Sequence, residues 1–197
     1  MKSADKWDQY YRDRHTPWDH AGPAPAIQEV IEHVDFPPSS EVLVPGCGFG
    51  HDVKAFAAAG FRATGLDISE IAINEARLVS AGDNVTFIQG DLFDPTLPDQ
   101  KRYDVIWEHT CFCAMAISTR KSYVDAVYNL LKPGGVLVGL FYMDSGVPLE
   151  EGPPFDVDHD EVHRLFSPMF VLEQDNLPLR AYESRIGRER LMRWRRY

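Results

Sequence analysis

Short apolar runs alternate with amphipathic stretches along most of this 197-residue chain. The run Val42-Leu43-Val44 stops at Pro45-Gly46, as a buried parallel strand would. Further strands are predicted at residues 63–66, 85–89, 104–107, 136–141, 171–174 and 190–197, and helices at 51–59, 70–80, 122–132 and around 160–166. This alternation predicts an α/β fold in three layers, doubly wound around a mostly parallel seven-stranded sheet. A ligand should lie at the carboxyl ends of the strands, where the strand order reverses.

The segment before this alternation is predicted to form two helices joined by a Pro/Gly-rich link. The first covers polar and aromatic residues 5–14, and the link covers residues 15–25. The second helix has apolar side chains at helical spacing, namely Ile27, Val30, Ile31 and Val34. From the pattern alone, the aromatic residues Trp7, Tyr11 and Trp18 belong to an amphipathic helix that packs on the core.

Composition narrows the possible classes of protein. With 44% hydrophobic and 25% charged residues, the chain is expected to form one domain over residues 1–197. The net charge of −10 argues against a nucleic-acid partner. No apolar stretch is long enough for a membrane span or resembles a signal peptide, so we expect a cytoplasmic protein, monomeric or weakly homo-oligomeric. Three cysteines at unrelated spacings indicate reduced thiols.

A glycine turn, Gly46-Cys47-Gly48-Phe49-Gly50, lies between the first predicted strand and its helix. Glycines let the backbone turn sharply and approach a ligand closely, although a plain turn explains a glycine triplet equally well. Position 51 is His, so the Gly-x-Gly-x-x-Gly that binds the pyrophosphate of nicotinamide and flavin cofactors is absent. The turn therefore favours a ligand without a pyrophosphate.

Two carboxylates point to a nucleoside. Asp67 closes the second strand 21 residues after Gly46, near the offset expected for an acid that holds a ribose diol. Asp91 follows the third strand, so it, or the backbone at Leu92, can meet the edge of the base. Asp67 alone is also explained as the cap of the helix that begins near Glu70, but the two acids together favour a ligand. A glycine turn of this kind followed by two acids at strand ends is what a site for S-adenosylmethionine needs.

Sequence segments across nearly the whole chain carry a more specific resemblance. They are Trp7-Asp8-Gln9-Tyr10-Tyr11, Thr16-Pro17-Trp18-Asp19, Leu43-Val44-Pro45-Gly46-Cys47-Gly48, Gly50-His51-Asp52-Val53, Gly65-Leu66-Asp67-Ile68-Ser69, Phe112-Cys113-Ala114, Leu130-Leu131-Lys132-Pro133, Gly152-Pro153-Pro154-Phe155, Gly187-Arg188-Glu189-Arg190-Leu191 and Arg193-Trp194. In these segments the chain resembles the class I S-adenosylmethionine-dependent methyltransferases of the thiopurine S-methyltransferase superfamily. The similarity is greatest to the halide/thiol methyltransferase branch.

This resemblance implies a Rossmann-like class I methyltransferase fold with an antiparallel last strand and with residues 1–35 as a helical lid. It implies S-adenosyl-L-methionine as cofactor and S-adenosyl-L-homocysteine as product. Gly46 and Gly48 would approach the methionine part, Asp67 the ribose, and Asp91 with Leu92 the adenine. The other implied cofactor contacts are Trp7, Tyr11, Trp18, Cys47, Ile68, Glu108 and His109. His109 stands where thiopurine enzymes carry an arginine, a departure that favours a non-purine acceptor.

The implied reaction is an in-line displacement on an activated methyl group, which requires no covalent protein intermediate. Catalysis then depends on positioning and on stripping water from a small soft nucleophile: a halide, thiocyanate, hydrosulfide or thiol. The candidate pocket residues are Trp18, Phe49, Phe112 and Tyr142. The Tyr142 hydroxyl is the candidate catalytic group because it can orient the acceptor, although the ring is equally explained as packing at a strand end.

Alternative functions remain open from the sequence. Within enzymes they are methylation of thiopurines or other aromatic thiols, or of selenium and tellurium species. Outside transferases they are a nicotinamide oxidoreductase, disfavoured by the missing pyrophosphate sequence, and a nucleotide-binding module without turnover.

Several conspicuous side chains receive ordinary structural interpretations. His159 and His163 are spaced i, i+4, but the acid between them is misplaced for His-Glu-x-x-His, so a capped surface helix and no metal are predicted. Cys111 and Cys113 are expected to pack rather than react. Arg120 is expected to pair locally or to attract an anion. The arginines of residues 185–196 are expected on a solvated outer strand.

Overall fold

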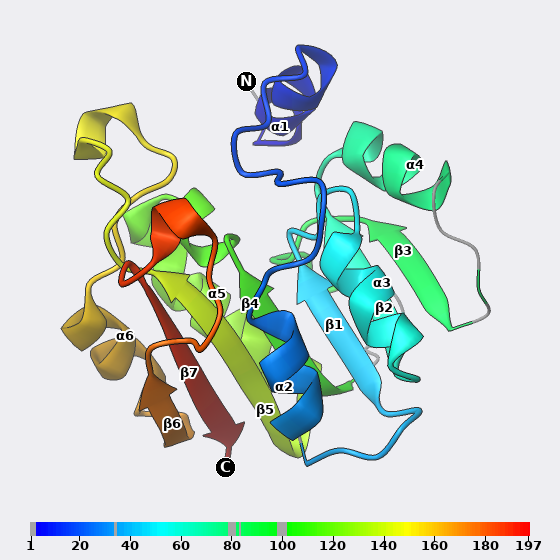
Figure 1. The fold of residues 1–197 in the computed structure, drawn as a ribbon, viewed down its shortest axis with the longest axis vertical. Coiled ribbons are helices and arrows are strands. Elements are labelled where there is room, and N and C mark those ends of the chain that lie inside the picture. The colour runs from blue at the N-terminus through cyan, green and yellow to red at the C-terminus, as the bar shows by residue number, and fades with distance from the viewer. Residues whose placement is uncertain (1–2, 34, 79–81, 83, 98–101) are drawn as a thin grey trace.

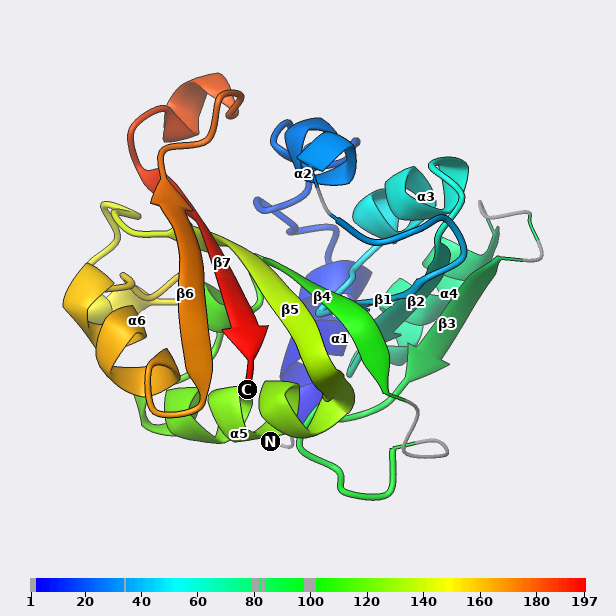
Figure 2. The ribbon, with the colours of Figure 1, turned by 90° about the horizontal axis from the view of Figure 1, so that it is seen from below.

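The computed structural model describes residues 3–33, 35–78, 82, 84–97 and 102–197, which form a seven-stranded sheet with helices on both faces (Figures 1 and 2). The strands are β1 (Glu41–Pro45), β2 (Arg62–Asp67), β3 (Val85–Gln89), β4 (Tyr103–His109), β5 (Leu131–Tyr142), β6 (Phe170–Asn176) and β7 (Glu189–Arg196). The helices are α1 (Ser3–Arg12), α2 (Ile27–His33), α3 (His51–Ala58), α4 (Glu70–Leu78), α5 (Arg120–Leu130) and α6 (His159–Phe166). Short 3-10 helices are η2 (Phe112–Ala114), η3 (Ile117–Thr119), η4 (Leu149–Glu151) and η5 (Glu183–Arg185).

The strand order is β3-β2-β1-β4-β5-β7-β6, and it confirms the predicted doubly wound sheet. The pairs β1–β2, β2–β3, β1–β4 and β4–β5 are parallel, while β7 runs antiparallel between β5 and β6. The chain winds outward from β1 to β3 and then returns to β4, so the order reverses between β1 and β4. Ligands of open α/β sheets bind at such a reversal.

Two apolar layers, one on each face, make the fold three-layered. Val42 and Val44 belong to the layer shared with α2, α3 and α4, whereas Leu43 between them belongs to the layer shared with α5 and α6. Trp107 and Trp194 are fully buried in the first and second layer respectively. A strand covered on both sides is apolar at consecutive positions, which explains why β1 shows no polar alternation.

The predicted fifth strand begins earlier than expected. Helix α5 ends at Leu130, two residues before the predicted end at 132, and β5 starts at once with Leu131 rather than at residue 136. Leu131 pairs with Tyr103, and the register then shifts before the regular ladder with β4 resumes. The intervening residues therefore form an irregularity within the strand rather than a separate loop. Val34, expected on a helix face, and residues 79 and 80 of the predicted helix 70–80 lie outside the described residues.

The N-terminal helix α1 lies at the carboxyl ends of the strands, on the side of α4 (Figure 1). It is attached through Asp8, whose Oδ1 accepts hydrogen bonds from the Ser69 hydroxyl at 2.6 Å and, more weakly, from the Ile71 backbone at 3.4 Å. Within the described residues, no helix is both long enough and apolar enough to cross a membrane.

The close packing of β2 against the glycine turn yields a stability test. A Cβ added at Gly65 would lie 2.7 Å from the Cys47 sulfur and 2.8 Å from the Phe87 ring. Gly65→Ala should therefore lower the free energy of unfolding by about 1–3 kcal/mol, the usual cost of overpacking a core. Urea denaturation measures this. The same change at Gly22, where the nearest atom to an added Cβ is 4.0 Å away, is the control and should have little effect.

Candidate active site

The glycine turn is hydrogen-bonded directly to the acid that ends β2. The Gly48 N–H donates to Asp67 Oδ2 and the Ser69 N–H donates to Asp67 Oδ1, each at 2.9 Å. Gly46 and Gly48 have φ angles of +61° and +51°, and a Cβ on Gly46 would come within 2.9 Å of the Cys111 sulfur, so side chains are excluded there. Burial raises the pKa of Asp67 despite the two N–H donors. Each carboxylate oxygen keeps a lone pair for a further donor.

Aromatic residues of the N-terminal segment gather over this turn. The Tyr11 hydroxyl lies 3.1 Å from where a Cβ on Gly48 would be. The Tyr11 ring meets Phe49 edge-on at 5.3 Å and Trp18 at 5.9 Å, and Trp7 meets Trp18 at 5.5 Å. Burial, followed by the negative charge of Asp67, raises the pKa of Tyr11 far above its usual value. Four residues predicted from the sequence are thus brought together beside Asp67.

Four further predicted cofactor contacts lie around the same end of the sheet. The Cys47 thiol packs against β2, and burial raises its pKa well above that of a free cysteine, so it stays neutral. Ile68 and Leu92 are half-buried. Asp91 is exposed, and its Oδ1 accepts a hydrogen bond from the Phe93 N–H at 2.9 Å. These positions leave Asp91 accessible to a ligand, and its role stays a prediction.

A buried acid that sequence reasoning did not select, Asp52, joins three parts of the chain. Its Oδ1 accepts the Ala24 N–H at 2.7 Å; its Oδ2 accepts the Trp107 indole N–H at 2.7 Å and lies 3.0 Å from His109 Nδ1. Burial acts to raise the pKa of Asp52, but the charge and hydrogen bond of His109, with the other donors, hold it below its usual value. Asp52 therefore stays ionised and orients the His109 ring.

Glu108, predicted to contact the cofactor, uses both carboxylate oxygens within the chain. Oε1 accepts the Cys111 and Phe112 N–H groups at 2.9 and 2.8 Å, and Oε2 accepts the Tyr123 hydroxyl. The side chain is 1% exposed, and burial raises its pKa more than these donors lower it. Glu108 therefore holds the loop after β4 in place through these hydrogen bonds.

Sequence reasoning also missed Arg185, which it placed among solvated terminal arginines. That expectation is wrong: β7 lies between β5 and β6 rather than at the edge of the sheet, and Arg185 is only 6% exposed because two aromatic rings cover its guanidinium. The guanidinium carbon lies 4.6 Å from the centre of the Tyr142 ring and 5.7 Å from that of Tyr182, and Nη1 pairs with Glu189 Oε1 at 3.1 Å. Tyr142 and Glu189 are register partners at the ends of β5 and β7. Two features of the sequence could have indicated that Arg185 is buried: its i, i+4 spacing to Glu189 and the nearby Tyr182.

The loop after α1 reaches the same region. The His20 ring stacks on Tyr182 at 3.9 Å, and the Tyr182 hydroxyl donates to the Pro23 carbonyl at 3.2 Å. Asp19 Oδ1 lies 3.2 Å from His51 Nε2 at the start of α3. The N-terminal segment thus bridges the glycine turn and the Arg185 side of the sheet.

Phe112, predicted as a pocket wall, is 1% exposed and packs in the core against Phe141 at 5.5 Å. The neighbouring Cys113 accepts the Phe155 N–H through its carbonyl at 2.7 Å, and burial raises the pKa of its thiol to about 12.

Arg120 is fully buried; it pairs with Glu161 and donates to the Phe155 carbonyl at 3.2 Å. The expected local pairing is therefore wrong, because these partners lie 35 to 41 residues further along the chain, and Arg120 instead fastens the Pro-rich loop to α5 and α6.

The histidine pair on α6 contacts an acid of β6. His159 Nε2 and His163 Nε2 lie 2.8 and 3.3 Å from the same oxygen, Asp175 Oδ2. Asp158 Oδ1 accepts the Glu161 N–H at 2.8 Å, so the predicted capped helix is confirmed. The expectation of no metal is untested and stays a prediction.

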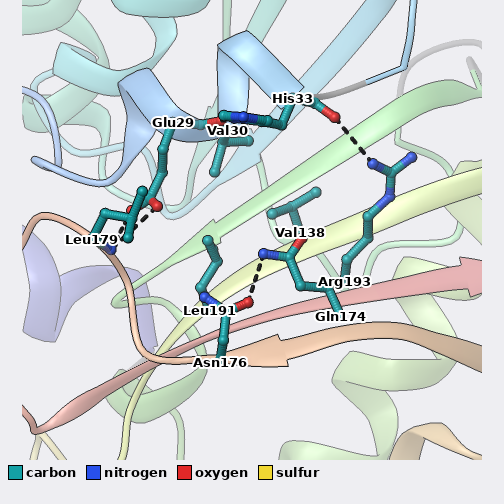
Figure 3. A pocket seen from close by; sticks show the side chains of 9 residues that line it. All are labelled: Glu29, Val30, His33, Val138, Gln174, Asn176, Leu179, Leu191 and Arg193. Atoms are coloured by element: carbon teal, nitrogen blue, oxygen red, sulfur yellow. Dashed lines mark hydrogen bonds between the residues drawn. The ribbon is translucent and has the colours of Figure 1, made fainter.

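A separate cavity of about 240 Å³ lies between α2 and the face of β5, β7 and β6 (Figure 3). Glu29 accepts the Leu179 N–H at its edge, and Arg193 donates to the His33 carbonyl. Val138, in the middle of β5, forms part of its wall. No residue of the glycine turn lines this cavity, so it is distinct from the candidate site.

The family model of thiopurine S-methyltransferase matches residues 2–195. The chain belongs to this family. It is an S-adenosylmethionine-dependent methyltransferase, as the resemblance implied. It is 32% identical to the probable thiol methyltransferase 2 of Arabidopsis thaliana, over 98% of this chain and 86% of that relative. It is also 32% identical to thiocyanate methyltransferase 1 of Arabidopsis thaliana, over 96% and 84%, and 27% identical to a thiopurine S-methyltransferase of Xanthomonas campestris, over 86% and 84%.

Solved structures confirm the class I methyltransferase fold. One, from work on the conversion of a disulfide bond into a thioacetal group in echinomycin biosynthesis, aligns with a TM-score of 0.78 at 23% identity, over 98% of this chain and 92% of that one. Another is the 1,6-didemethyltoxoflavin-N1-methyltransferase of Burkholderia thailandensis with bound S-adenosylhomocysteine. It aligns with a TM-score of 0.76 at 20% identity, over 98% and 86%.

The raised pKa of Glu108 gives a pH-dependent stability. A group whose pKa is higher in the folded state stabilises the fold fully below its unfolded pKa, and this contribution disappears as pH rises through the folded pKa. Glu108→Gln removes the titration while keeping a carbonyl acceptor. The variant should therefore gain stability relative to the unsubstituted protein as pH rises from 4 to 8. Urea midpoints across that range measure the difference. Glu32→Gln, on the exposed face of α2, should show no such trend.

Proposed function

We propose that this methyltransferase acts on a small soft nucleophile: a halide, thiocyanate, hydrosulfide or thiol. S-adenosyl-L-methionine, when bound, supplies a methyl group already activated by the sulfonium charge. The chain then has to bind this cofactor, orient the acceptor and exclude water. The observation that carries the proposal is the buried Arg185 guanidinium beside Tyr142.

The residues around the glycine turn fit the cofactor. Asp67 has a free lone pair on each oxygen for the two ribose hydroxyls, and its N–H partners keep it in place. Gly46 and Gly48 leave the backbone open where a side chain would collide. The aromatic faces of Trp18 and Tyr11 lie beside the turn and attract a sulfonium through cation–π interaction.

The opposite side of the strand ends fits an anionic or polarisable acceptor. Arg185 offers a positive charge, and the Tyr142 and Tyr182 rings shield it from water. In such a setting an anion loses little by giving up its hydration, because the guanidinium partly replaces it. The Tyr142 hydroxyl is the group we assign to orienting the acceptor. The plant relatives described as thiol and thiocyanate methyltransferases support this choice.

We also propose that α1 and the following loop, within residues 1–35, act as a lid over the cofactor. The polar attachments of α1 itself run from Asp8 to Ser69 and Ile71, whereas the loop after it is held more firmly, at Asp19, Pro23 and Ala24. A helix held by so few polar contacts can move away to admit the cofactor.

The lid proposal predicts that Asp8→Ala weakens cofactor binding about tenfold, since one charged hydrogen-bond anchor of α1 is lost. The melting temperature of the core should change little. Isothermal titration calorimetry with S-adenosylhomocysteine measures the affinity. Asp13→Ala, whose carboxylate is bonded to Gln9 within the same segment, is the control. Unchanged affinity in Asp8→Ala would contradict a lid role for α1.

The acceptor class is tested by headspace gas chromatography with S-adenosylmethionine and iodide, bromide, chloride, thiocyanate or hydrosulfide. We expect a volatile methyl product with at least one of these. Arg185→Gln should lower kcat/KM for the anions by about tenfold or more and leave cofactor affinity unchanged. A parallel assay uses an aromatic thiol. Turnover of the aromatic thiol with no volatile product from any anion would instead support the thiopurine-type activity named for the family.

A further inference from the structure

The proton positions on His109 follow from its partner. Asp52 is ionised and can only accept hydrogen bonds, so the His109 Nδ1 that faces it at 3.0 Å must carry a hydrogen. In the neutral ring, Nε2 is then an acceptor with a free lone pair. The Trp107 indole N–H and the Ala24 N–H donate to the same carboxylate, which prevents Asp52 from turning away. The chain thereby fixes one tautomer and one orientation of the ring.

The free nitrogen has no use in the protein itself. His109 Nε2 is buried and has no hydrogen-bond partner among the described residues. A buried polar atom without a partner costs about 1–3 kcal/mol. A group that arrives with the substrate can recover this cost. It must bring a hydrogen, because neutral Nε2 offers only a lone pair.

His109 lies on the acceptor side of the candidate site. It is the last residue of β4 and pairs with Leu140, two residues before Tyr142 on β5. His109 lies close enough to Glu189 and His20 to affect their pKa values, and Arg185 also lowers the pKa of His20. The unpartnered nitrogen therefore shares its surroundings with the guanidinium that the proposed function assigns to the acceptor.

Glu108, Asp67 and the nearby cysteine thiols are poorly placed for proton transfer. Both oxygens of Glu108 accept hydrogen bonds within the chain. Asp67 is bonded to the glycine turn on the cofactor side. The thiols of Cys47 and Cys111 have pKa values raised well above normal by burial, so they are neither bases nor nucleophiles at neutral pH.

We propose that His109 is the general base of this enzyme and that its substrate is a protonated thiol or hydrogen sulfide. The inference rests on the proposed methyl transfer to a soft nucleophile and narrows its acceptor. The S–H proton passes to Nε2 while the acceptor sulfur uses a lone pair to bond the methyl carbon. The bond from that carbon to the sulfonium sulfur breaks, and its electron pair stays on S-adenosylhomocysteine. The imidazolium, held by Asp52, then releases the proton to water.

The unpartnered Nε2 of His109 also favours thiols over halides as the acceptor. A halide or thiocyanate carries no proton, so a base gives it no advantage. An alkanethiol with a pKa near that of free cysteine is only a few per cent thiolate at pH 7, so a base can raise its reactive fraction substantially. The alternative role for His109 is to bind an anionic acceptor as an imidazolium. The base and the anion-binding role predict different dependence of activity on the acceptor.

The test compares acceptors in His109→Asn, in which the side-chain amide can still donate to Asp52 but offers no base at Nε2. At pH 7, kcat/KM for an alkanethiol should fall about 30- to 100-fold. For iodide, and for an acidic aromatic thiol that is already a thiolate, it should change less than about threefold. Raising the pH to 10 should shrink the alkanethiol defect, because solution thiolate bypasses the base. His33→Asn, at the far end of α2, is the matched control.

A measurement on the unsubstituted enzyme complements the variant. The pH profile of kcat/KM should show an acidic limb with alkanethiol that is absent with iodide. Asp52 from α3 contacts His109, and the other ionisable groups that interact with it electrostatically are Glu108 from its own strand, Glu189 from β7 and His20 from the N-terminal loop. Calorimetry with S-adenosylhomocysteine checks that His109→Asn is folded and binds the cofactor.

Each outcome has one meaning. Equal losses for iodide and alkanethiol in His109→Asn, or identical pH profiles for both, overturn the base and favour anion binding by an imidazolium. Full alkanethiol activity in His109→Asn also overturns it. If the unsubstituted enzyme binds the cofactor but methylates none of these acceptors, the proposed acceptor class fails, and the thiol assignment fails with it.

Discussion

The buried carboxylate of Asp52 is the interaction on which the arrangement of the site depends. Removing an ionised carboxylate from water costs several kcal/mol, and in Asp52 three N–H donors offset that cost. These donors come from the N-terminal loop and from two positions on β4, while Asp52 itself lies in the first turn of α3. One side chain thus fixes the cover, the central strand and the glycine-turn helix relative to one another. Loss of any donor would leave part of a buried charge unpaired.

Much of the fold could be predicted because the central strands are covered on both faces. Val42-Leu43-Val44 must be apolar throughout, and such runs mark strands directly. The ends of strands were harder to predict, as β4 shows. Its predicted end was Trp107, since Glu108 and His109 are polar, yet both remain in the ladder. Glu108 bonds to Tyr123, and His109 bonds to Asp52 through Nδ1, partners that no local pattern identifies.

In the site, too, features set by neighbouring residues could be predicted, whereas partners distant in the sequence could not. The glycine turn and Asp67 were predictable because their spacing is local to one strand-turn-helix unit and the next strand. Asp52 was not, since an acid in the first helical turn is ordinarily explained by the helix dipole, and its partners Ala24 and His109 lie 28 and 57 residues away. Arg185 was hidden in a basic terminal stretch. Phe112 is an aromatic residue of the kind that lines pockets, but it is buried against the sheet.

Charge at the strand ends is divided between two sides, and this division bears on the acceptor. Asp67 gives the glycine-turn side a negative charge that attracts a sulfonium, whereas the β5–β7 side carries the Arg185 guanidinium, whose charge Glu189 partly offsets. The net charge of −10 is spread over the chain and screened beyond about 8 Å, while a guanidinium 4 Å from an anion attracts it by about 4 kcal/mol. An acidic protein can therefore bind an anionic acceptor locally. A thiol avoids the long-range repulsion altogether, because it approaches as a neutral molecule and gains its negative charge only when Nε2 of His109 takes the proton beside Arg185.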